Sequence, residues 1–122
     1  FPQGGIKKNE SPKVAMYREL KEEIGLEPEH VQLIYATTDW LRYRLPEKYI
    51  RKDSEPLCVG QKQIWYLLKL IVDEKYLDLT TTVEPEFDLW KWVDFWQPVD
   101  EIIFFKREVY EQALKQLELH LI

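Results

Sequence analysis

Residues 4–26 read GGIKKNESPKVAMYRELKEEIGL and contain both a start signal and a stop signal for a helix. Ser11 followed by Pro12 predicts the start, with serine as the N-cap and proline at the first helical position. Gly25 predicts the end, because glycine readily adopts the left-handed conformation that closes many helices. Apolar residues recur between these signals at helical spacing. We therefore expect an amphipathic helix that buries one face.

The polar face of this helix carries Glu19, Glu22 and Glu23. With Glu19 at zero on a helical wheel, the other two lie at about −60° and +40°, since each residue turns by about 100°. Like charges at these spacings repel one another, and only Arg18, four residues before Glu22, can offset one of them directly. Mg²⁺ prefers oxygen ligands and shares them with substrate phosphates. The cluster therefore predicts either a divalent-metal site or a solvated acidic face.

The wider spacing forms a second pattern, which reads G-x5-E-x7-R-E-L-x-E-E-x-G-L from Gly4 to Leu26. This pattern resembles the Nudix box at every defined position. The resemblance implies a loop–helix–loop catalytic element, hydrolysis of a diphosphate linked to another group, and Mg²⁺ or Mn²⁺ as the cofactor. By this resemblance, Glu19, Glu22 and Glu23 correspond to the catalytic metal ligands of the family. It matches the positions that hold the loop with Gly4, Gly5, Glu10, Arg18 and Gly25.

Segments outside the box extend the resemblance over nearly the whole chain. They are FPQGG at 1–5, WLRYRLP at 40–46, GQKQIWYLL at 60–68, PEFDLWKWV at 85–93 and FKREVY at 105–110. Together with the box they resemble the bacterial RNA 5′-pyrophosphohydrolase subfamily, a close relative of the asymmetric dinucleoside polyphosphate hydrolases. The expected substrate is therefore tri- or diphosphorylated RNA, with a dinucleoside polyphosphate as the alternative. A non-catalytic nucleotide-binding module is disfavoured, because all the metal-ligand glutamates are present.

The same resemblance implies further site residues. It matches Glu86 with an acidic residue beside the metals, either a ligand or the base that deprotonates water; a loop glutamate without a role is the alternative. It matches Phe105 and Lys106 with residues that hold the first nucleotides, although Phe105 ends an apolar run in which core packing is the default. Tyr43 and Gln61 match contacts to the 5′ nucleotides or phosphates. Other substrate-binding candidates are Gln3 at the phosphate site and Arg42, Arg44, Arg51 and Lys52 for backbone electrostatics.

The fold expected from these signals is α/β, a Nudix α/β/α sandwich with a mixed central sheet and a C-terminal helix. Beyond the first helix we expect strands at 31–36, 63–72, 77–82 and 89–95, a turn-rich connection at 39–56, and a helix at 106–121. Trp65, Trp90 and Trp92 alternate with polar residues, which predicts that they are buried in the core. At 122 residues the chain suits a single Nudix domain, residues 1–122. Since the family has a further strand or two before FPQGG, we expect this domain to be N-terminally incomplete.

Net charge and cysteine content limit the kinds of partner and the cellular compartment that we expect for this protein. The formal net charge of −5 argues against a general nucleic-acid binder, so any RNA contact must be local. Residues 42–52 contain five basic side chains and one acid, which indicates either a local contact or a solvated basic loop. The single cysteine excludes an internal disulfide and favours a cytoplasmic setting. We expect a monomer. Since no long apolar run occurs, we also expect that the protein does not enter membranes.

Overall fold

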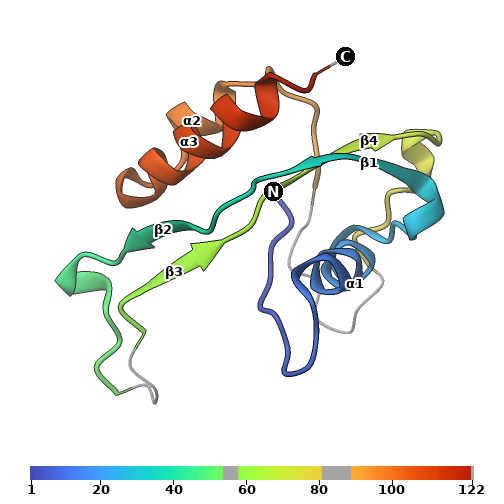
Figure 1. Cartoon of the computed structure of the whole chain (residues 1–122). Coiled ribbons are helices and arrows are strands. Elements are labelled where there is room, and N and C mark those ends of the chain that lie inside the picture. Colours follow the sequence, from blue (N-terminus) through green and yellow to red (C-terminus); the bar gives the residue numbers. More distant parts are fainter. Residues whose placement is uncertain (54–57, 81–88, 122) are drawn as a thin grey trace. The chain divides into compact units, whose positions relative to one another are not determined.

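The protein is described here from a computed structural model that covers residues 1–53, 58–80 and 89–121 (Figure 1). The chain divides into two compact units. One consists of Phe1–Ile34 with Tyr66–Trp92, and the other of Tyr35–Trp65 with Val93–Ile122. Helices and strands both occur and a helix lies near the C-terminus, in agreement with the expected α/β class. No helix in the described ranges is long and apolar enough to cross a membrane.

The first unit is organised by α1 (Pro12–Ile24). The Ser11 hydroxyl accepts a hydrogen bond from the Val14 N–H at 3.2 Å, and Pro12 occupies the first turn. At the other end Gly25 has a φ of 74°, and its N–H donates to the Lys21 carbonyl at 3.0 Å. The start and stop predicted from the sequence are therefore confirmed. Gly25 is also needed for space, because a Cβ there would lie 2.8 Å from the Cβ of Asp78.

Strands and short helices complete this unit. They are η1 (Pro28–His30), β1 (Val31–Ala36), which pairs with β4 (Tyr66–Leu70), and η3 (Glu74–Tyr76). Leu20, Leu26 and Val31 form the buried cluster. Tyr17, Ile24, Leu68, Leu70 and Leu77 pack against it. The apolar face of the first helix is thus buried as its spacing predicts.

The second unit is built on β2 (Leu41–Arg44) and β3 (Gly60–Gln63), which pair antiparallel. It also contains η2 (Glu47–Tyr49), α2 (Gln97–Glu101), η4 (Phe104–Lys106) and α3 (Arg107–Glu118). Figure 1 shows α2 and α3 on one side of the β2–β3 ribbon. Leu41, Val109 and Ala113 form the buried core between ribbon and helix, with Tyr43 and Trp65 against it. The terminal helix and the core position of Trp65 are therefore confirmed.

The strand predicted at 63–72 and the connection predicted at 39–56 differ from the structure, because hydrogen-bond partners change along the chain. The strand expected at 63–72 is divided, since β3 ends at Gln63 and β4 begins at Tyr66. At the division Trp65 N–H donates to the Thr37 hydroxyl at 3.0 Å, and Thr37 N–H donates to the Trp65 carbonyl at 2.8 Å. The connection expected at 39–56 contains β2 and η2. The described part of the sheet structure consists of two two-stranded sheets in place of one mixed sheet.

The strands expected at 77–82 and 89–95 are wrong as far as the structure describes them. At 78–80 the Asp78 carboxylate accepts hydrogen bonds from the Thr80 N–H and hydroxyl, which favours a turn. Residues 89–94 pair with none of the described strands, so alternation there does not bury either face. Trp90 and Trp92 are 41% and 67% exposed, which corrects their predicted core placement. Trp92 Nε1–H instead donates to Glu74 Oε2 at 2.6 Å.

Candidate active site

Arg18 is the centre of the polar face of α1. Its Nε and Nη2 donate to the two carboxylate oxygens of Glu10 at 2.8 and 2.9 Å, and Nη2 also donates to the Gly5 carbonyl at 2.7 Å. Its Nη1 donates to Glu19 Oε1 at 2.6 Å and to Glu22 Oε2 at 3.3 Å. One guanidinium therefore contacts three carboxylates, whereas the sequence predicted that Arg18 offsets the charge of only one glutamate. The contacts to Glu10 and Gly5 are those that a loop-holding residue would make.

The Glu10–Arg18 pair remains ionised over the physiological pH range. The hydrogen bond from Arg18, followed by the one from the Lys7 N–H, lowers the pKa of Glu10 from 4.5 to about 2. The same hydrogen bond to Glu10, with a second to Glu19, raises the pKa of Arg18. Glu10 precedes the first residue of α1, as predicted. A doubly hydrogen-bonded arginine–carboxylate pair of this kind restricts the geometry of the loop as well as its charge.

The three helix glutamates differ in exposure. The Glu19 side chain is 16% exposed and that of Glu22 is 45% exposed, while Glu23 is buried at 4%. Within residues 1–53, 58–80 and 89–121, no three His, Cys, Asp or Glu side chains are already arranged to hold a metal ion. The Arg18 guanidinium contacts both Glu19 and Glu22. Glu86, the fourth predicted carboxylate, lies outside the described residues.

The two glycines before the helix differ in their surroundings. A Cβ added at Gly4 would overlap the carboxylate of Glu19, whereas one at Gly5 would meet nothing within 4 Å. The lack of a side chain at Gly4 therefore allows the loop backbone to approach Glu19 closely. Gln3 precedes these glycines in the same unit and is exposed.

Four of the predicted substrate residues come together in the second unit, although they lie far apart in the sequence. The Tyr43 hydroxyl donates to Gln61 Oε1 at 2.9 Å across β2 and β3. The Phe105 ring centroid lies 5.8 Å from that of Tyr43, and Lys106 Nζ lies 5.6 Å from the Tyr43 ring centroid. Tyr49, which the sequence did not single out, adds a ring 5.0 Å from Phe105. Burial raises the pKa of the Tyr43 hydroxyl, so this group is a neutral hydrogen-bond donor.

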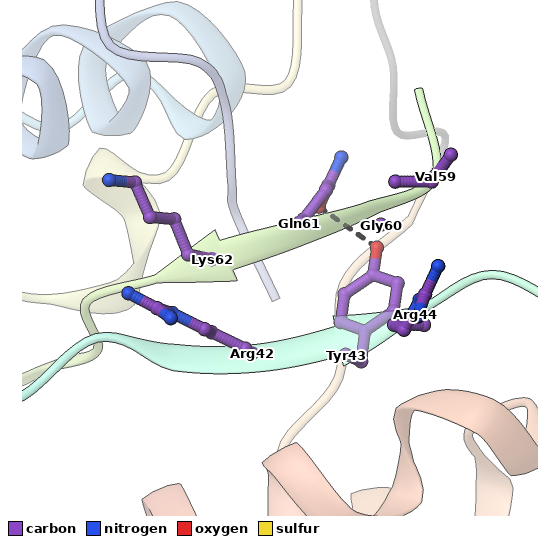
Figure 2. Close-up of a pocket in the computed structure, with 7 residues that line it drawn as sticks. All are labelled: Arg42, Tyr43, Arg44, Val59, Gly60, Gln61 and Lys62. Carbon is purple, nitrogen blue, oxygen red and sulfur yellow. Dashed lines mark hydrogen bonds between the residues drawn. The ribbon is translucent and has the colours of Figure 1, made fainter. Parts of the chain in front are cut away.

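A pocket of about 280 Å³ opens on the β2–β3 ribbon (Figure 2). Its lining consists of Arg42, Tyr43, Arg44, Val59, Gly60, Gln61 and Lys62. Arg42 and Arg44 were predicted to contact substrate; Lys62 was not, because only the strand register brings it opposite Arg42. Of the other bases in the 42–52 segment, Lys52 lies 3.7 Å from Glu47, and Lys48 Nζ lies 5.1 Å from the Tyr49 ring centroid.

The family model for the NUDIX domain matches residues 1–113. The chain belongs to the Nudix family. The resemblance seen in the 4–26 pattern is therefore confirmed. Nudix hydrolases generally use divalent metal ions.

This Nudix chain is similar to bacterial proteins that bear the name RNA pyrophosphohydrolase. The relative from Thioalkalivibrio sulfidiphilus is 58% identical over 96% of the chain, that from Hahella chejuensis 56% over 95%, and that from Haemophilus influenzae 55% over 95%. The chain spans 68%, 72% and 59% of the length of these relatives, in that order.

Proposed function

We propose that this Nudix domain removes pyrophosphate or phosphate from the 5′ end of tri- or diphosphorylated RNA and leaves a 5′-monophosphate. The observation that carries the proposal is the cluster of Tyr43, Gln61, Phe105 and Lys106, in a chain more than half identical to relatives named RNA pyrophosphohydrolase. A shelf of aromatic rings next to amide and ammonium donors suits a nucleotide and its phosphates. Such an activity belongs to RNA 5′-end processing and mRNA decay.

The proposed catalytic groups are Glu19, Glu22, Glu23 and Glu86, which would hold Mg²⁺ or Mn²⁺. Carboxylate oxygens are the donors that these hard cations prefer. A second observation also supports a cation at these carboxylates: Glu19 and Glu22 already contact one cationic group, the Arg18 guanidinium. When bound, the ion would acidify a water molecule and neutralise phosphate oxygens. Arg18 could release Glu19 and Glu22 while Glu10 and the Gly5 carbonyl still hold it.

The reaction we propose is an in-line displacement at phosphorus. A water oxygen forms a bond to the phosphorus that stays with the RNA, and the P–O bond to the leaving pyrophosphate or phosphate breaks. The water proton passes to a carboxylate of the glutamate set, with Glu86 as a candidate base. Phe105 can stack a base with little sequence preference. Lys106 can meet a phosphate as a point charge, while Tyr43 and Gln61 supply hydrogen bonds.

Product analysis with 5′-triphosphorylated RNA and Mg²⁺ tests the proposal. The parent protein should release pyrophosphate, while Glu19→Gln and Glu86→Gln should each lower kcat at least 10²-fold, as loss of a positioned acid–base group does. Glu29→Gln is the matched control, since Glu29 is an exposed glutamate of η1 outside the predicted set. Equal activity of the parent and both glutamine variants would remove the proposed mechanism.

A dinucleoside polyphosphate is the second candidate substrate. The aromatic rings of Tyr43, Tyr49 and Phe105 suit a nucleoside, whether it is the first nucleotide of an RNA or one end of a dinucleoside polyphosphate. Competition between triphosphorylated RNA and diadenosine tetraphosphate at equal concentration distinguishes the two through kcat/KM. Nucleotide binding without turnover at saturating metal would favour a non-catalytic module. The monomeric state and the cytoplasmic location of the protein remain predictions.

A further inference from the structure

The β2–β3 ribbon carries three basic side chains on one face. The register places Arg42 opposite Lys62 and Arg44 opposite Gly60. Residues two apart on a strand point to the same side, so Arg42, Arg44 and Lys62 share a face, and Tyr43 and Gln61 belong to the other. All three bases are exposed. Figure 2 shows the charged ends of Arg42 and Lys62 extending toward the same end of the ribbon.

This arrangement is electrostatically unfavourable for the protein alone. Like charges directly opposite on neighbouring strands destabilise the pair. Across the described ranges, no acidic side chain forms an ion pair with Arg42, Arg44 or Lys62. This local excess of positive charge occurs in a chain whose net charge is −5. A local conflict of this kind is expected where a ligand resolves it.

The basic face lies on the same ribbon as the predicted 5′-nucleotide contacts Tyr43 and Gln61. Lys62 Nζ lies 4.7 Å from the centroid of the Trp40 ring, a cation–π contact that holds the ammonium in place. The pocket of about 280 Å³ is lined by the three bases and by the hydrogen-bonded Tyr43–Gln61 pair. The two sets of side chains lie on opposite faces of one narrow ribbon and can therefore contact different parts of one RNA.

We infer that Arg42, Arg44 and Lys62 bind the phosphodiester backbone of single-stranded RNA downstream of its 5′ end. Arg42 and Arg44 are separated by about 6.6–6.8 Å along the strand, from two residues of rise, so the face presents a row of cations to a row of phosphates. This inference rests on the proposed function and adds a second contact region to it. The domain thereby holds a longer RNA more tightly than a dinucleotide, through charge and without reading base sequence.

The test measures the affinity of the full chain for fluorescent 5′-hydroxyl oligoribonucleotides of two and twelve nucleotides at several salt concentrations. The 5′-hydroxyl end removes the terminal phosphates from the comparison. Each lost phosphate contact lowers the slope of log K against log salt by about 0.7 for a single strand. The double variant Arg42→Gln/Lys62→Gln should therefore lose about 1.4 in slope with the twelve-nucleotide RNA and less with the dinucleotide.

The matched control is Lys69→Gln/Lys115→Gln, which removes two exposed lysines of β4 and α3 that are not part of the ribbon and leaves the same net charge as the ribbon double variant. Arg44→Gln alone gives a second measurement, with an expected loss of about 0.7. Equal slopes for the ribbon and control doubles would overturn the inference, as would an equal loss with both RNA lengths. The same loss with a polyglutamate peptide would also overturn it, since the face would then be a general anion surface.

The outcomes separate this inference from the proposed activity. If the protein releases pyrophosphate from triphosphorylated RNA while the ribbon variants keep the parent slope, the inference fails and the activity stands. If the slope falls as expected while no pyrophosphate or phosphate is released, the proposed activity fails and the RNA-binding face stands.

Discussion

Replacing Gly4 with alanine should weaken divalent-cation binding while leaving the protein folded. The new Cβ would overlap the Glu19 carboxylate, which contacts Arg18 at 2.6 Å. The far end of a glutamate side chain can rotate more easily than the loop backbone can move. The substitution should therefore be relieved by displacement of the Glu19 carboxylate, one of the proposed metal ligands.

The size of each effect follows from the local geometry. Loss of the interaction that orients a metal ligand costs about 10–100-fold in metal affinity, which corresponds to about 1.4–2.8 kcal/mol. An off-rotamer Glu19 would cost about 0.5–1.5 kcal/mol of folding free energy. A glycine-to-alanine change stabilises by about 0.4–1 kcal/mol where the backbone tolerates it, and Gly4 does not have a positive φ. The free energy of unfolding should change by less than about 1 kcal/mol.

Mn²⁺ titration followed by electron paramagnetic resonance measures the affinity, and urea unfolding measures the stability. Gly5→Ala is the matched control, because a Cβ at Gly5 meets nothing within 4 Å and its carbonyl still accepts from Arg18. Mn²⁺ binding by Gly4→Ala as tight as that of the parent would show that the Gly4–Glu19 approach does not orient a metal ligand. An equal loss of affinity in Gly5→Ala would show the same.

Three further substitutions test other parts of the structure. Since the folded-state pKa of Glu10 is lowered from 4.5 to about 2, its stabilising contribution is complete above pH 4.5 and is lost as the pH falls toward 2. Glu10→Gln should remove that acid dependence of the free energy of unfolding in urea, and an unchanged pH profile would contradict the Arg18 contact. Leu20→Ala should lower the free energy of unfolding by about 2–5 kcal/mol, because Leu20 is 6% exposed within its cluster. Phe105→Ala should weaken RNA binding by about 1–3 kcal/mol through lost stacking. Phe104→Ala should weaken it less, because Phe105 lies 5.8 Å from Tyr43 and 5.0 Å from Tyr49, whereas Phe104 lies 6.4 Å from Tyr49; equal losses would argue against a role specific to Phe105.

The parts of the fold that depend on neighbours in sequence were predictable. The ends of α1 follow from Ser11, Pro12 and Gly25, because capping bonds join residues only a few positions apart. The buried face of α1 and the amphipathic α3 follow from helical periodicity in the same way. The wheel grouped Glu19, Glu22 and Glu23 on one face and placed Arg18 within reach of Glu22, whereas the contact of Arg18 with Glu19 and the burial of Glu23 required the packed structure.

Pattern alone failed where a strand needs a partner from elsewhere in the chain. Trp90 and Trp92 alternate with polar residues as a half-buried strand would, yet both are exposed. Alternation indicates which side of a strand could be buried, but only a hydrogen-bonded neighbour stabilises the strand itself. The exchange of hydrogen bonds between Thr37 and Trp65 that separates β3 from β4 is likewise a long-range feature.

The capped helix, the spacing of its carboxylates and the family of the chain were predictable from the residues alone, because these are local or linear properties. Folding of the whole chain was needed to join one arginine to Glu10, Glu19 and Glu22, and to place Lys62 opposite Arg42. It also brought Tyr43 and Phe105 to 5.8 Å of each other. These contacts depend on strand register and on how α3 and η4 pack against the ribbon, and no short stretch of the chain encodes either one.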